Sequence, residues 1–543
     1  MLNLSELAHV YMMVDAIPPE VKVGSRVYCD GHYSTVLYIG EVPPTEGVWL
    51  GIEWDEPSRG KHDGTHNNNR YFTTRHPNSG SFVRPKKVEF GVTCFEAIQE
   101  RYGVMDDVHA GVIQEELYVK GTSKNTVVEM VGAQKVNLQQ GQLNLLKEAG
   151  IRGCKVYGAG PRHNLSMKTP NLRDLDISKT LLPSWEEVAR ITTQLKHLTS
   201  LNVSDNRLQL PRNPDLLAKA FQKLKTLYLN RMDLNFSEVL ACSDLWPKLE
   251  TLHLCYNNIN KLCPLDGKLQ NLEFLNLEGN SLENWDELLH FGRLPRLETI
   301  IANNIGLKGI SFPNTPLNKK TGYFLALRVL SVNNNQLSQW SDINELNKLS
   351  QLEELRIKHN PVEKLLDLET TREFIIAKIA KLKLLNRSDV FPKERKGSEI
   401  DYLKKFGKEW LTAGGNQDPE KNKPNQQFLL DHPRYQDIVD LYGAPEDSEM
   451  TTQSKTLKDN LIMVTIVSQQ APDKKPLVKK LPSTMTVQKL KTLVQRLFKA
   501  DMSSLSLSYI SKKMEGPTIE LENDLRQLSY YSIENGDTIQ VKW

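Results

Sequence analysis

A spaced pattern of leucines and polar residues recurs through the middle of the chain. The pattern LxxLxLxxNxL has five clear copies, LTSLNVSDNRL, LETLHLCYNNI, LEFLNLEGNSL, LRVLSVNNNQL and LEELRIKHNPV, which begin at Leu198, Leu249, Leu272, Leu327 and Leu352. Three weaker copies begin at Leu172, Leu224 and Leu297. Successive copies start 23 to 30 residues apart and keep phase, which predicts a stack of similar units that share one core.

Each copy contains a short alternation of apolar and polar residues, which is typical of a strand with one buried face. The leucines at the centre of these strands are predicted to stack inside, among them Leu175, Leu201, Leu252 and Leu275. The array resembles the leucine-rich repeat family, in which one asparagine per repeat satisfies backbone groups where the strand turns. The resemblance implies such a ladder at Asn206, Asn257, Asn280, Asn335 and Asn360, with breaks at Thr180, Met232 and Ile305.

Repeat solenoids usually bind partners through the concave strand face, and both an inert scaffold and a binding surface stay open for this array. One row of that face is mixed and polar, as in a protein-binding surface, and consists of Asp176, Asn202, Tyr228, His253, Asn276, Ile301, Ser331 and Arg356. The candidate protein-binding residues on this face are Tyr228, His253, Arg356 and Lys358. The repeats are assigned to residues 166–385, and a cap that closes their core to residues 386–412.

Residues 461–543 show a different order of elements. The strand-like segments IMVTIV and PLVKKLP precede an amphipathic helix, TVQKLKTLVQRLF, and the strands LSLSYI and DTIQVKW follow it. This order resembles the ubiquitin-like β-grasp fold. Because the chain ends in Val541, Lys542 and Trp543 without a diglycine, an integral interaction domain is expected rather than a conjugated modifier.

Segments of low apolar content flank these regions. Residues 413–460 contain AGGNQDPEKNKPNQQ and EDSEMTTQSKTLKDN, which are predicted to be flexible linker. Between them, the apolar residues Tyr435, Ile438, Val439, Leu441 and Tyr442 predict a short helix that docks on another part of the protein. Residues 93–165 are assigned as a connecting segment. Residues 1–20 are predicted to be a short helix or tail, because they lack the basic n-region and cleavage site of a signal peptide.

Composition excludes several classes of protein. The 543 residues have a formal net charge of only +3, which gives no global electrostatic case for nucleic-acid binding. No run of 18 apolar residues occurs, so no membrane-spanning helix is predicted. The six cysteines are scattered without a CxxC pair, which disfavours structural zinc and fits the reduced thiols of a cytoplasmic protein.

The stretch GKHDG, residues 60–64, could form a phosphate loop, a metal loop or part of a peptide-binding groove. A phosphate loop requires Ser or Thr after GxxxxGK, whereas His62 follows Lys61 here. A calcium loop requires alternating oxygen ligands over twelve residues, and only Asp63 qualifies nearby. Neither a nucleotide nor a metal cofactor is therefore expected at this stretch.

The segments around GKHDG favour the third possibility. They are VGSRVYCDGHYSTVLYIGEV, EGVWLGIEWD, RYF and SGSFVRPKKV, in the order and spacing of the CAP-Gly domain. Residues 21–92 thus resemble this glycine-rich β-fold, whose members bind protein C-termini. The resemblance implies a peptide-binding groove that contains Trp49, Lys61, His62, Asp63, Phe82 and Arg84. The alternative that Trp49 and Phe82 are only core residues stays open.

The residue types in this region suit an acidic peptide that ends in an aromatic residue. Such a peptide needs an apolar slot, donors for its terminal carboxylate and positive charge for its glutamates. Residues 57–88 offer one acidic residue, Asp63, and seven basic residues, Arg59, Lys61, Arg70, Arg75, Arg84, Lys86 and Lys87. His62 stands where the family has asparagine, and its ring can donate a hydrogen bond without reproducing the amide's paired donor and acceptor. A different affinity or ligand preference is expected.

The three regions together predict a multidomain α/β and β protein: an N-terminal CAP-Gly β-fold, a central leucine-rich repeat solenoid and a C-terminal ubiquitin-like β-grasp domain. This order resembles the tubulin-folding cofactors, a family of cytoplasmic chaperones of the cytoskeleton. The resemblance implies that the CAP-Gly domain binds the C-terminal tail of α-tubulin and that the repeats bind its body. It also implies joint action with the other cofactors (B, C and D) in assembly and dissociation of the αβ-tubulin heterodimer.

No covalent reaction is expected of this chain, because no catalytic triad, nucleotide loop or metal cluster occurs in motif context. Two alternative functions remain. A microtubule-associated CAP-Gly adaptor is expected to carry coiled-coil heptads, and none run through this sequence. A ubiquitin-pathway adaptor would leave the CAP-Gly domain unexplained, although proteasome or ubiquitin-pathway components are further expected partners of the ubiquitin-like domain. Neither nucleic acid nor a membrane is expected as a partner.

Overall fold

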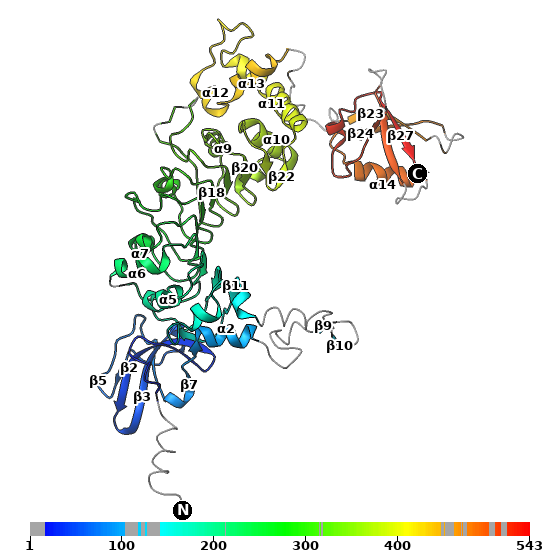
Figure 1. Cartoon of the computed structure of the whole chain (residues 1–543). Coiled ribbons are helices and arrows are strands. Elements are labelled where there is room, and N and C mark those ends of the chain that lie inside the picture. Colours follow the sequence, from blue (N-terminus) through cyan, green and yellow to red (C-terminus); the bar gives the residue numbers. More distant parts are fainter. Residues whose placement is uncertain are drawn as a thin grey trace, which may run out of the picture. The chain divides into compact units, whose positions relative to one another are not determined.

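The computed structural model describes residues 17–103, 118–120, 125–127, 142–211, 213–313, 315–316, 319–446, 450, 461–468, 470, 475–498, 505–511 and 518–543. Contacts divide the chain into two units, Met1–Pro445 and Glu446–Trp543 (Figure 1). The predicted N-terminal tail up to residue 16 and the predicted linker at 447–449 and 451–460 lie outside the described residues. Within the described ranges, no helix combines the length and the apolar character that crossing a bilayer requires.

The first unit begins with a five-stranded antiparallel sheet in the order β6-β3-β2-β1-β7. Its strands are β1 (Arg26–Cys29), β2 (His32–Val42), β3 (Thr45–Trp54), β6 (Gly80–Val83) and β7 (Val88–Glu89). One face is buried through Val27, Val36, Leu50 and Ile52. Because side chains alternate along a strand, Trp49, Gly51 and Glu53 of β3 lie on the opposite face.

Short elements surround this sheet. A small hairpin between β3 and β6 consists of β4 (Thr65–His66) and β5 (Asn69–Arg70). Two 3-10 turns, η1 (Pro57–Arg59) and η2 (Pro85–Lys87), precede the hairpin and β7. The GKHDG stretch therefore lies in the loop between η1 and β4.

The region predicted as a connecting segment, 93–165, instead contributes to the end of the repeat array. β8 (Val92–Thr93) pairs with β12 (Val156–Gly158), and β11 (Glu148–Gly150) pairs in parallel with the first repeat strand. The other elements are α2 (Cys94–Tyr102), β9 (Tyr118–Lys120), β10 (Asn125–Val127), η4 (Leu143–Leu145) and α4 (Asn164–Lys168). Ile98 of α2 and Ile151 after β11 are buried in the repeat core, so this region closes its first end.

The eight repeats each supply one strand to a continuous sheet. These parallel strands are β13 (Asp174–Asp176), β14 (Ser200–Asn202), β15 (Thr226–Tyr228), β16 (Thr251–His253), β17 (Phe274–Asn276), β18 (Thr299–Ile301), β19 (Val329–Ser331) and β20 (Glu354–Arg356). The central residue of every strand is buried, and the third residues stand in register from Asp176 to Arg356. The predicted row of residues on the strand face is therefore confirmed.

Short helices and 3-10 turns connect the repeat strands (Figure 1). They are α5 (Trp185–Thr192), α6 (Pro214–Phe221), α7 (Phe236–Cys242), η5 (Ser243–Leu245), α8 (Trp285–Leu288), η6 (Leu289–Phe291), α9 (Trp340–Leu346) and η7 (Pro361–Lys364). Large rings from these connections fill the core, since Trp185 and Trp246 lie 5.4 Å apart and both are buried. Aromatic burial of this kind is a major part of core stability.

The predicted asparagine ladder is present. The side-chain oxygen of Asn257 accepts a hydrogen bond from the Met232 N–H at 2.8 Å, and its amide nitrogen donates to the Leu229 and Leu254 carbonyls at 2.7 and 3.0 Å. Equivalent bonds are made by Asn206, Asn280, Asn335 and Asn360. Each asparagine therefore serves its own repeat and the preceding one, as buried backbone groups require.

The predicted breaks in the ladder differ from one another. At Thr180 the break is partial: the hydroxyl donates at 3.0 Å to the Ile177 carbonyl, as an asparagine would within its own repeat, but among the described residues the side chain makes no bond to the preceding repeat. At Met232 and Ile305 the side chains contain no hydrogen-bond donor, so the ladder is interrupted. The backbone N–H groups of both residues are still satisfied by the asparagine of the following repeat.

The far end of the array is closed by helices that extend beyond the predicted cap at 386–412. The elements are α10 (Leu368–Lys378), β21 (Leu384–Leu385), β22 (Ser388–Asp389), α11 (Pro392–Thr412), α12 (Gln426–Asp431) and α13 (Tyr435–Tyr442). Phe374, Tyr402, Trp410, Phe428 and Tyr435 form one buried cluster. Residues 413–445 therefore pack on α11, in contrast to the flexible linker that their polar composition predicted.

The second unit has the predicted order of elements. β23 (Leu461–Ser468), β24 (Leu477–Pro482), α14 (Val487–Phe498), β25 (Ser506–Ile510), β26 (Ile519–Glu520), η8 (Leu528–Tyr531) and β27 (Thr538–Lys542) form a mixed sheet, in the order β24-β23-β27-β25-β26, with one helix. Val487, Leu490 and Val494 of α14 are buried against the sheet. This arrangement is the β-grasp predicted from the alternation of the sequence.

Candidate functional site

The GKHDG loop is held against the first residue of β6. The backbone N–H groups of Lys61 and His62 both donate to the Gly80 carbonyl, at 2.7 and 3.2 Å, and the Gly80 N–H donates back to the His62 carbonyl at 2.8 Å. Gly64 has a φ of +95°, and a Cβ at this position would lie 2.1 Å from the Phe72 carbonyl oxygen. Only glycine satisfies both conditions, so the second glycine of the stretch fixes the path of the loop.

Asp63 stabilises this loop from within. Its carboxylate accepts from the Thr65 N–H at 3.2 Å and from the Arg70 guanidinium at 2.6 Å. The hydrogen bonds from Thr65, with the charge of Arg70, hold the pKa of this carboxyl below its ordinary value. These two bonds tie the end of the GKHDG loop to β4 and β5.

His62 has a defined tautomer because of the turn that follows it. Its Nδ1 accepts a hydrogen bond from the Gly64 N–H at 3.0 Å. Burial lowers the pKa of the imidazole, so the neutral ring carries its hydrogen on Nε2. The sequence predicted that this histidine can still donate from one ring nitrogen, and the turn identifies that nitrogen as Nε2.

Phe82 of β6 is the centre of an aromatic cluster. Around its ring lie His62 at 4.9 Å, Phe72 at 5.4 Å, Tyr71 at 5.5 Å, His66 at 6.2 Å and Tyr38 at 6.3 Å between centroids. Phe72 is buried, whereas Phe82 is half-buried. Part of the Phe82 ring is therefore accessible on this face of the sheet. We call these six residues the aromatic cluster.

The aromatic cluster sits over a glycine in the neighbouring strand. Phe82 is paired with Gly51 of β3, and Gly51 is paired with Tyr38 of β2. A Cβ on Gly51 would lie 2.4 Å from the Phe72 ring and 2.9 Å from the Tyr38 Cβ. The missing side chain therefore makes room for three rings on one face of the sheet.

Four members of the cluster were not among the predicted site residues. Tyr38, His66, Tyr71 and Phe72 come from β2, β4 and the segment after β5. Tyr71 and Phe72 belong to the quoted RYF segment, and the CAP-Gly resemblance was the one signal that pointed to them. Tyr38 had no signal of its own, because a β-bulge between Val36 and Tyr38 shifts the alternation of β2.

Trp49 and Arg84 form the edge of the same face. The Arg84 guanidinium stacks 3.9 Å from the centre of the Trp49 ring and donates to the Val48 carbonyl at 3.3 Å. The Trp49 Nε1–H donates to the Thr45 hydroxyl at 2.8 Å. Within residues 17–103 no ring contact joins Trp49 and Phe82, but Phe82 is paired with Gly51, two residues after Trp49 on the same face of β3, so the two residues are diagonal neighbours on that face.

The seven basic residues of this region divide into groups. Arg70 pairs with Asp63, and Arg59 lies 2.9 Å from His32 Nε2 and over the Trp54 ring at 5.1 Å. Arg75 lines a separate cavity next to the repeats. Of the other four, Arg84 lies against the Trp49 ring, and Lys61, Lys86 and Lys87 are exposed.

The repeat face brings together some of its predicted residues. The rings of Tyr228 and His253 are stacked at 4.2 Å, and Phe274 lies 5.1 Å from His253. Burial lowers the pKa of His253 to about 4, so this imidazole is neutral at pH 7. Phe274, which sequence reasoning missed, stands two positions before Asn276 of the predicted row, on the same face of the strand. Its place in the LxL alternation was the available signal.

Arg356 and Lys358 lie at the other end of this face. The Arg356 Nε donates to Glu354 of the same strand at 2.7 Å, which partly neutralises its charge. Lys358 is exposed, and its backbone N–H donates to the Asn333 side chain at 2.7 Å. The structure thus separates a central aromatic stack from a basic end.

Comparisons with known proteins agree with the domain types. The CAP-Gly domain profile matches residues 23–88, and the profile of a ubiquitin-like domain matches residues 461–542. Tubulin-specific chaperone E of Xenopus laevis is 47% identical over 95% of this chain and 98% of its own length. The protein of the same name from Homo sapiens is 44% identical over 98% of this chain and 100% of its own length.

Among solved structures, the chain is similar to the C-terminal ubiquitin-like domain of mouse tubulin-specific chaperone e. That match has 45% sequence identity and a TM-score of 0.16, and it covers 17% of this chain and 94% of the mouse domain.

Proposed function

This chain belongs to the tubulin-specific chaperone E family, and on that premise we propose that it captures α-tubulin through two linked contacts. The CAP-Gly domain binds the acidic C-terminal tail, and the strand face of the repeats binds the folded body. With the other tubulin-folding cofactors, B, C and D, the chain then acts in assembly and dissociation of the αβ-tubulin heterodimer. The proposed location is the cytoplasm and the cytoskeleton.

The observation that carries the tail contact is the aromatic cluster around the half-exposed Phe82. A terminal tyrosine or phenylalanine ring would pack edge-to-face against such rings, an arrangement that contributes about 0.5–1.5 kcal/mol per pair beyond burial. The loop beside the cluster supplies the exposed Lys61 ammonium and the His62 Nε2–H as donors for a terminal carboxylate. Lys86 and Lys87 add positive charge for glutamates.

The repeat face supports the second contact. The stack of Tyr228, His253 and Phe274 is a half-buried aromatic surface of the kind that anchors protein interfaces. Once the tail is held, binding of the body becomes effectively intramolecular, so two weak contacts together give strong capture. Discrimination between free α-tubulin and the heterodimer then comes from the body contact, because a tail grip is indifferent to β-tubulin.

The ubiquitin-like domain is proposed to contact a further cofactor or a component of the ubiquitin pathway or the proteasome. The chain itself is proposed to carry out no covalent step. Its relatives are named as chaperones, and the work of dissociation would come from contacts that favour captured α-tubulin over the paired state.

Titration of the full-length chain with a glutamate-rich peptide that ends in tyrosine tests the tail contact. Phe82→Ala is expected to weaken binding at least tenfold, and Lys61→Ala about three- to tenfold, the effect of one charge-assisted hydrogen bond. Amidation of the peptide carboxylate should weaken binding of the native chain to a similar extent. Arg162→Ala, at an exposed arginine outside the CAP-Gly domain, is the control. Equal affinity of the amidated peptide would contradict the proposal.

Capture of tubulin tests the body contact. Charge reversal at Arg356 and Lys358, or His253→Ala in the aromatic stack, is expected to reduce capture of α-tubulin from which the tail has been removed. Binding of the tail peptide to the same variants should not change. If neither variant affects capture, the repeat strand face is not the binding surface.

A further inference from the structure

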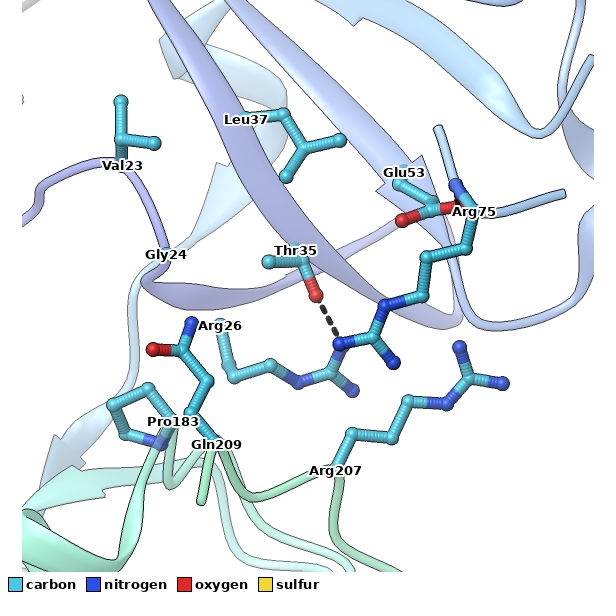
Figure 2. Close-up of a pocket in the computed structure, with 10 residues that line it drawn as sticks. All are labelled: Val23, Gly24, Arg26, Thr35, Leu37, Glu53, Arg75, Pro183, Arg207 and Gln209. Carbon is cyan, nitrogen blue, oxygen red and sulfur yellow. Dashed lines mark hydrogen bonds between the residues drawn. The ribbon is translucent and has the colours of Figure 1, made fainter. Parts of the chain in front are cut away.

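A cavity of about 210 Å³ lies where the CAP-Gly sheet meets the first repeats, and three arginines from distant parts of the chain line it (Figure 2). Arg26 comes from β1, Arg75 from the segment after β5, and Arg207 from the loop after β14. The remaining lining residues are Val23, Gly24, Thr35, Leu37, Glu53, Pro183 and Gln209. The cavity thus has walls from both domains of the first unit.

The two carboxylates near this cavity are already engaged. Asp55 binds the Arg26 guanidinium through both oxygens, and Arg207 donates to the Asp55 carbonyl at 2.8 Å. Glu53 accepts from the Arg75 N–H at 2.6 Å and from the Ser79 hydroxyl at 3.0 Å. Three guanidinium groups therefore face two carboxylates, which leaves an excess of one positive charge.

One donor in this cavity lacks an acceptor. Arg26 is only 5% exposed, and its Nε has no hydrogen-bond partner among the described residues, although its two terminal nitrogens bind Thr35 and Asp55. A buried donor of this kind normally finds a partner, because leaving it unpaired costs about 1–3 kcal/mol. The Arg75 guanidinium also makes no hydrogen bond or ion pair with the described residues. The bond from Arg75 to Glu53 comes from its backbone N–H. Because Arg26 Nε is itself buried, the Arg75 guanidinium is the donor that remains for a negatively charged ligand.

We propose that this cavity is a subsite for one carboxylate side chain of the acidic tail, upstream of the aromatic residue that occupies the aromatic cluster. The inference rests on the proposed function of the CAP-Gly face. Ligand pockets for whole small molecules usually measure about 300–1,000 Å³, so this smaller space suits a single side chain. An excess of one positive charge matches one carboxylate better than a doubly charged phosphate.

The position of the cavity on the sheet supports this assignment. Gly51, beneath the aromatic cluster, and Glu53, in the cavity wall, are two residues apart on the same face of β3, which corresponds to about 7 Å. Tyr38 of the cluster and Thr35 of the cavity lie on the neighbouring strand β2. An extended peptide covers about 3.3–3.6 Å per residue, so a glutamate a few positions before the terminus reaches the cavity.

The proposed subsite has a consequence for how the domains act together. Arg207 and Gln209 belong to the repeats, and Arg207 already contacts Asp55 of the CAP-Gly domain. A carboxylate bound between Arg75 and Arg207 would add bonds across this boundary. Tail binding would then stabilise one arrangement of the two domains in which the repeat face is presented to the body of the same tubulin molecule.

The test uses the full-length chain and two N-acetylated peptides: a short one, Ser-Ser-Tyr, which has no side-chain carboxylate, and a long one of seven glutamates followed by tyrosine. Arg75→Gln removes a guanidinium without removing the backbone bond to Glu53. It is expected to weaken the long peptide about five- to tenfold and the short peptide less than twofold. Arg207→Gln is expected to act in the same direction. Arg162→Gln, the same change at an exposed arginine, should affect neither peptide.

The outcomes separate the subsite from the proposed function. If the native chain binds neither peptide, the proposed function fails. If both peptides bind and Arg75→Gln weakens them equally or not at all, the subsite is overturned while the proposed function stands. Inorganic phosphate at constant ionic strength should displace the long peptide no better than acetate does, and stronger displacement by phosphate would overturn the assignment to a carboxylate. Unchanged thermal unfolding of each variant confirms that the fold is intact.

Discussion

The strand face of the repeats and the aromatic face of the CAP-Gly domain are both built on β-sheets, but different causes place their side chains. In the repeats, one residue per strand stands in register from Asp176 to Arg356 because every unit repeats the same buried leucine and the same turn. In the CAP-Gly domain, Phe82 meets rings from four separate segments around a loop held by Gly64 and Gly80.

This difference affects how each surface tolerates change. A solenoid distributes its stability over similar interfaces between neighbours, so damage in one repeat lowers the stability of the array and leaves distant surfaces intact. The aromatic face depends on a few backbone contacts with no repeated counterpart. Stability of the repeats and binding by the CAP-Gly face should therefore respond to different substitutions.

The largest expected effect comes from the repeat core. Leu275→Ala is expected to lower the free energy of unfolding of the array by about 2–5 kcal/mol, because Leu275 is fully buried in the central stack. Urea unfolding followed by fluorescence of the repeat tryptophans measures the change. Leu325→Ala, at a leucine that is 60% exposed, is the matched control. A large loss of peptide binding by folded Leu275→Ala protein would break the proposed independence of the two surfaces.

The asparagine ladder should give the next largest effect. Asn257→Ala leaves buried groups of two repeats without partners and is expected to cost about 1–3 kcal/mol for each unsatisfied group. The same urea titration measures it. Asn271→Ala removes a hydrogen bond to the Pro247 carbonyl that is exposed, and the cost should stay below about 1 kcal/mol. Equal costs for the two substitutions would show that the ladder has no special role.

The pH dependence of the repeat face should give a smaller effect. Since burial lowers the pKa of His253 from 6.5 to about 4, the unfolded chain binds a proton that the folded chain excludes between these values. The contribution of the neutral His253 to the free energy of unfolding is fully present above pH 6.5. As the pH drops toward 4, the free energy of unfolding decreases by about 1–3 kcal/mol after allowance for partial exposure.

The comparison that isolates this histidine is His253→Gln, which should flatten the decline in stability between pH 6.5 and 4.5. His197→Gln, at an exposed histidine of the same array, should leave the decline unchanged. His62 provides the counterpart in the CAP-Gly domain, since burial also lowers its pKa and acid should weaken the turn at Gly64. An identical pH profile for native and His253→Gln protein would contradict the assignment.

The smallest effect is expected at the edge of the aromatic face. Arg84→Ala removes the stack on Trp49 and should lower local stability of β3 by about 0.5–1 kcal/mol. Hydrogen exchange of the β3 amides in the full-length chain measures this change without unfolding the repeats. Lys86→Ala, at an exposed neighbour, should have no measurable effect on the same amides. If both variants increase the exchange rate of the β3 amides to a similar extent, the contact between Arg84 and Trp49 does not stabilise β3.

Local patterns in the sequence allowed prediction of much of the fold. The buried leucine of every repeat, the register of the strand face and most of the ladder follow from spacing alone, because each unit has the same neighbours. The order of elements in the second unit followed in the same way from alternation. The short docking helix near Tyr435 also followed from its apolar positions, but its packing partner α11 and the burial of Phe428 did not, because the segments around them are polar.

The candidate site shows the same division on a smaller scale. Trp49, Lys61, His62, Asp63, Phe82 and Arg84 were identified from the order of glycine-rich segments, and the structure places all of them on or beside one face of the sheet. Tyr38 joins that face only through a bulge in β2. This feature has no local signal, because it depends on pairing between strands.

The sequence by itself determined the periodic parts of this protein, because a repeated pattern of buried positions has one way to stack. It also determined the path of the loop at residues 60–64. Gly64 has a positive φ and lies against the Phe72 carbonyl oxygen, and only glycine fits both conditions. Tertiary structure alone decided which rings surround Phe82, and that Arg26, Arg75 and Arg207 share one cavity. Those arrangements join residues up to 181 positions apart in the sequence, and no local preference encodes such contacts.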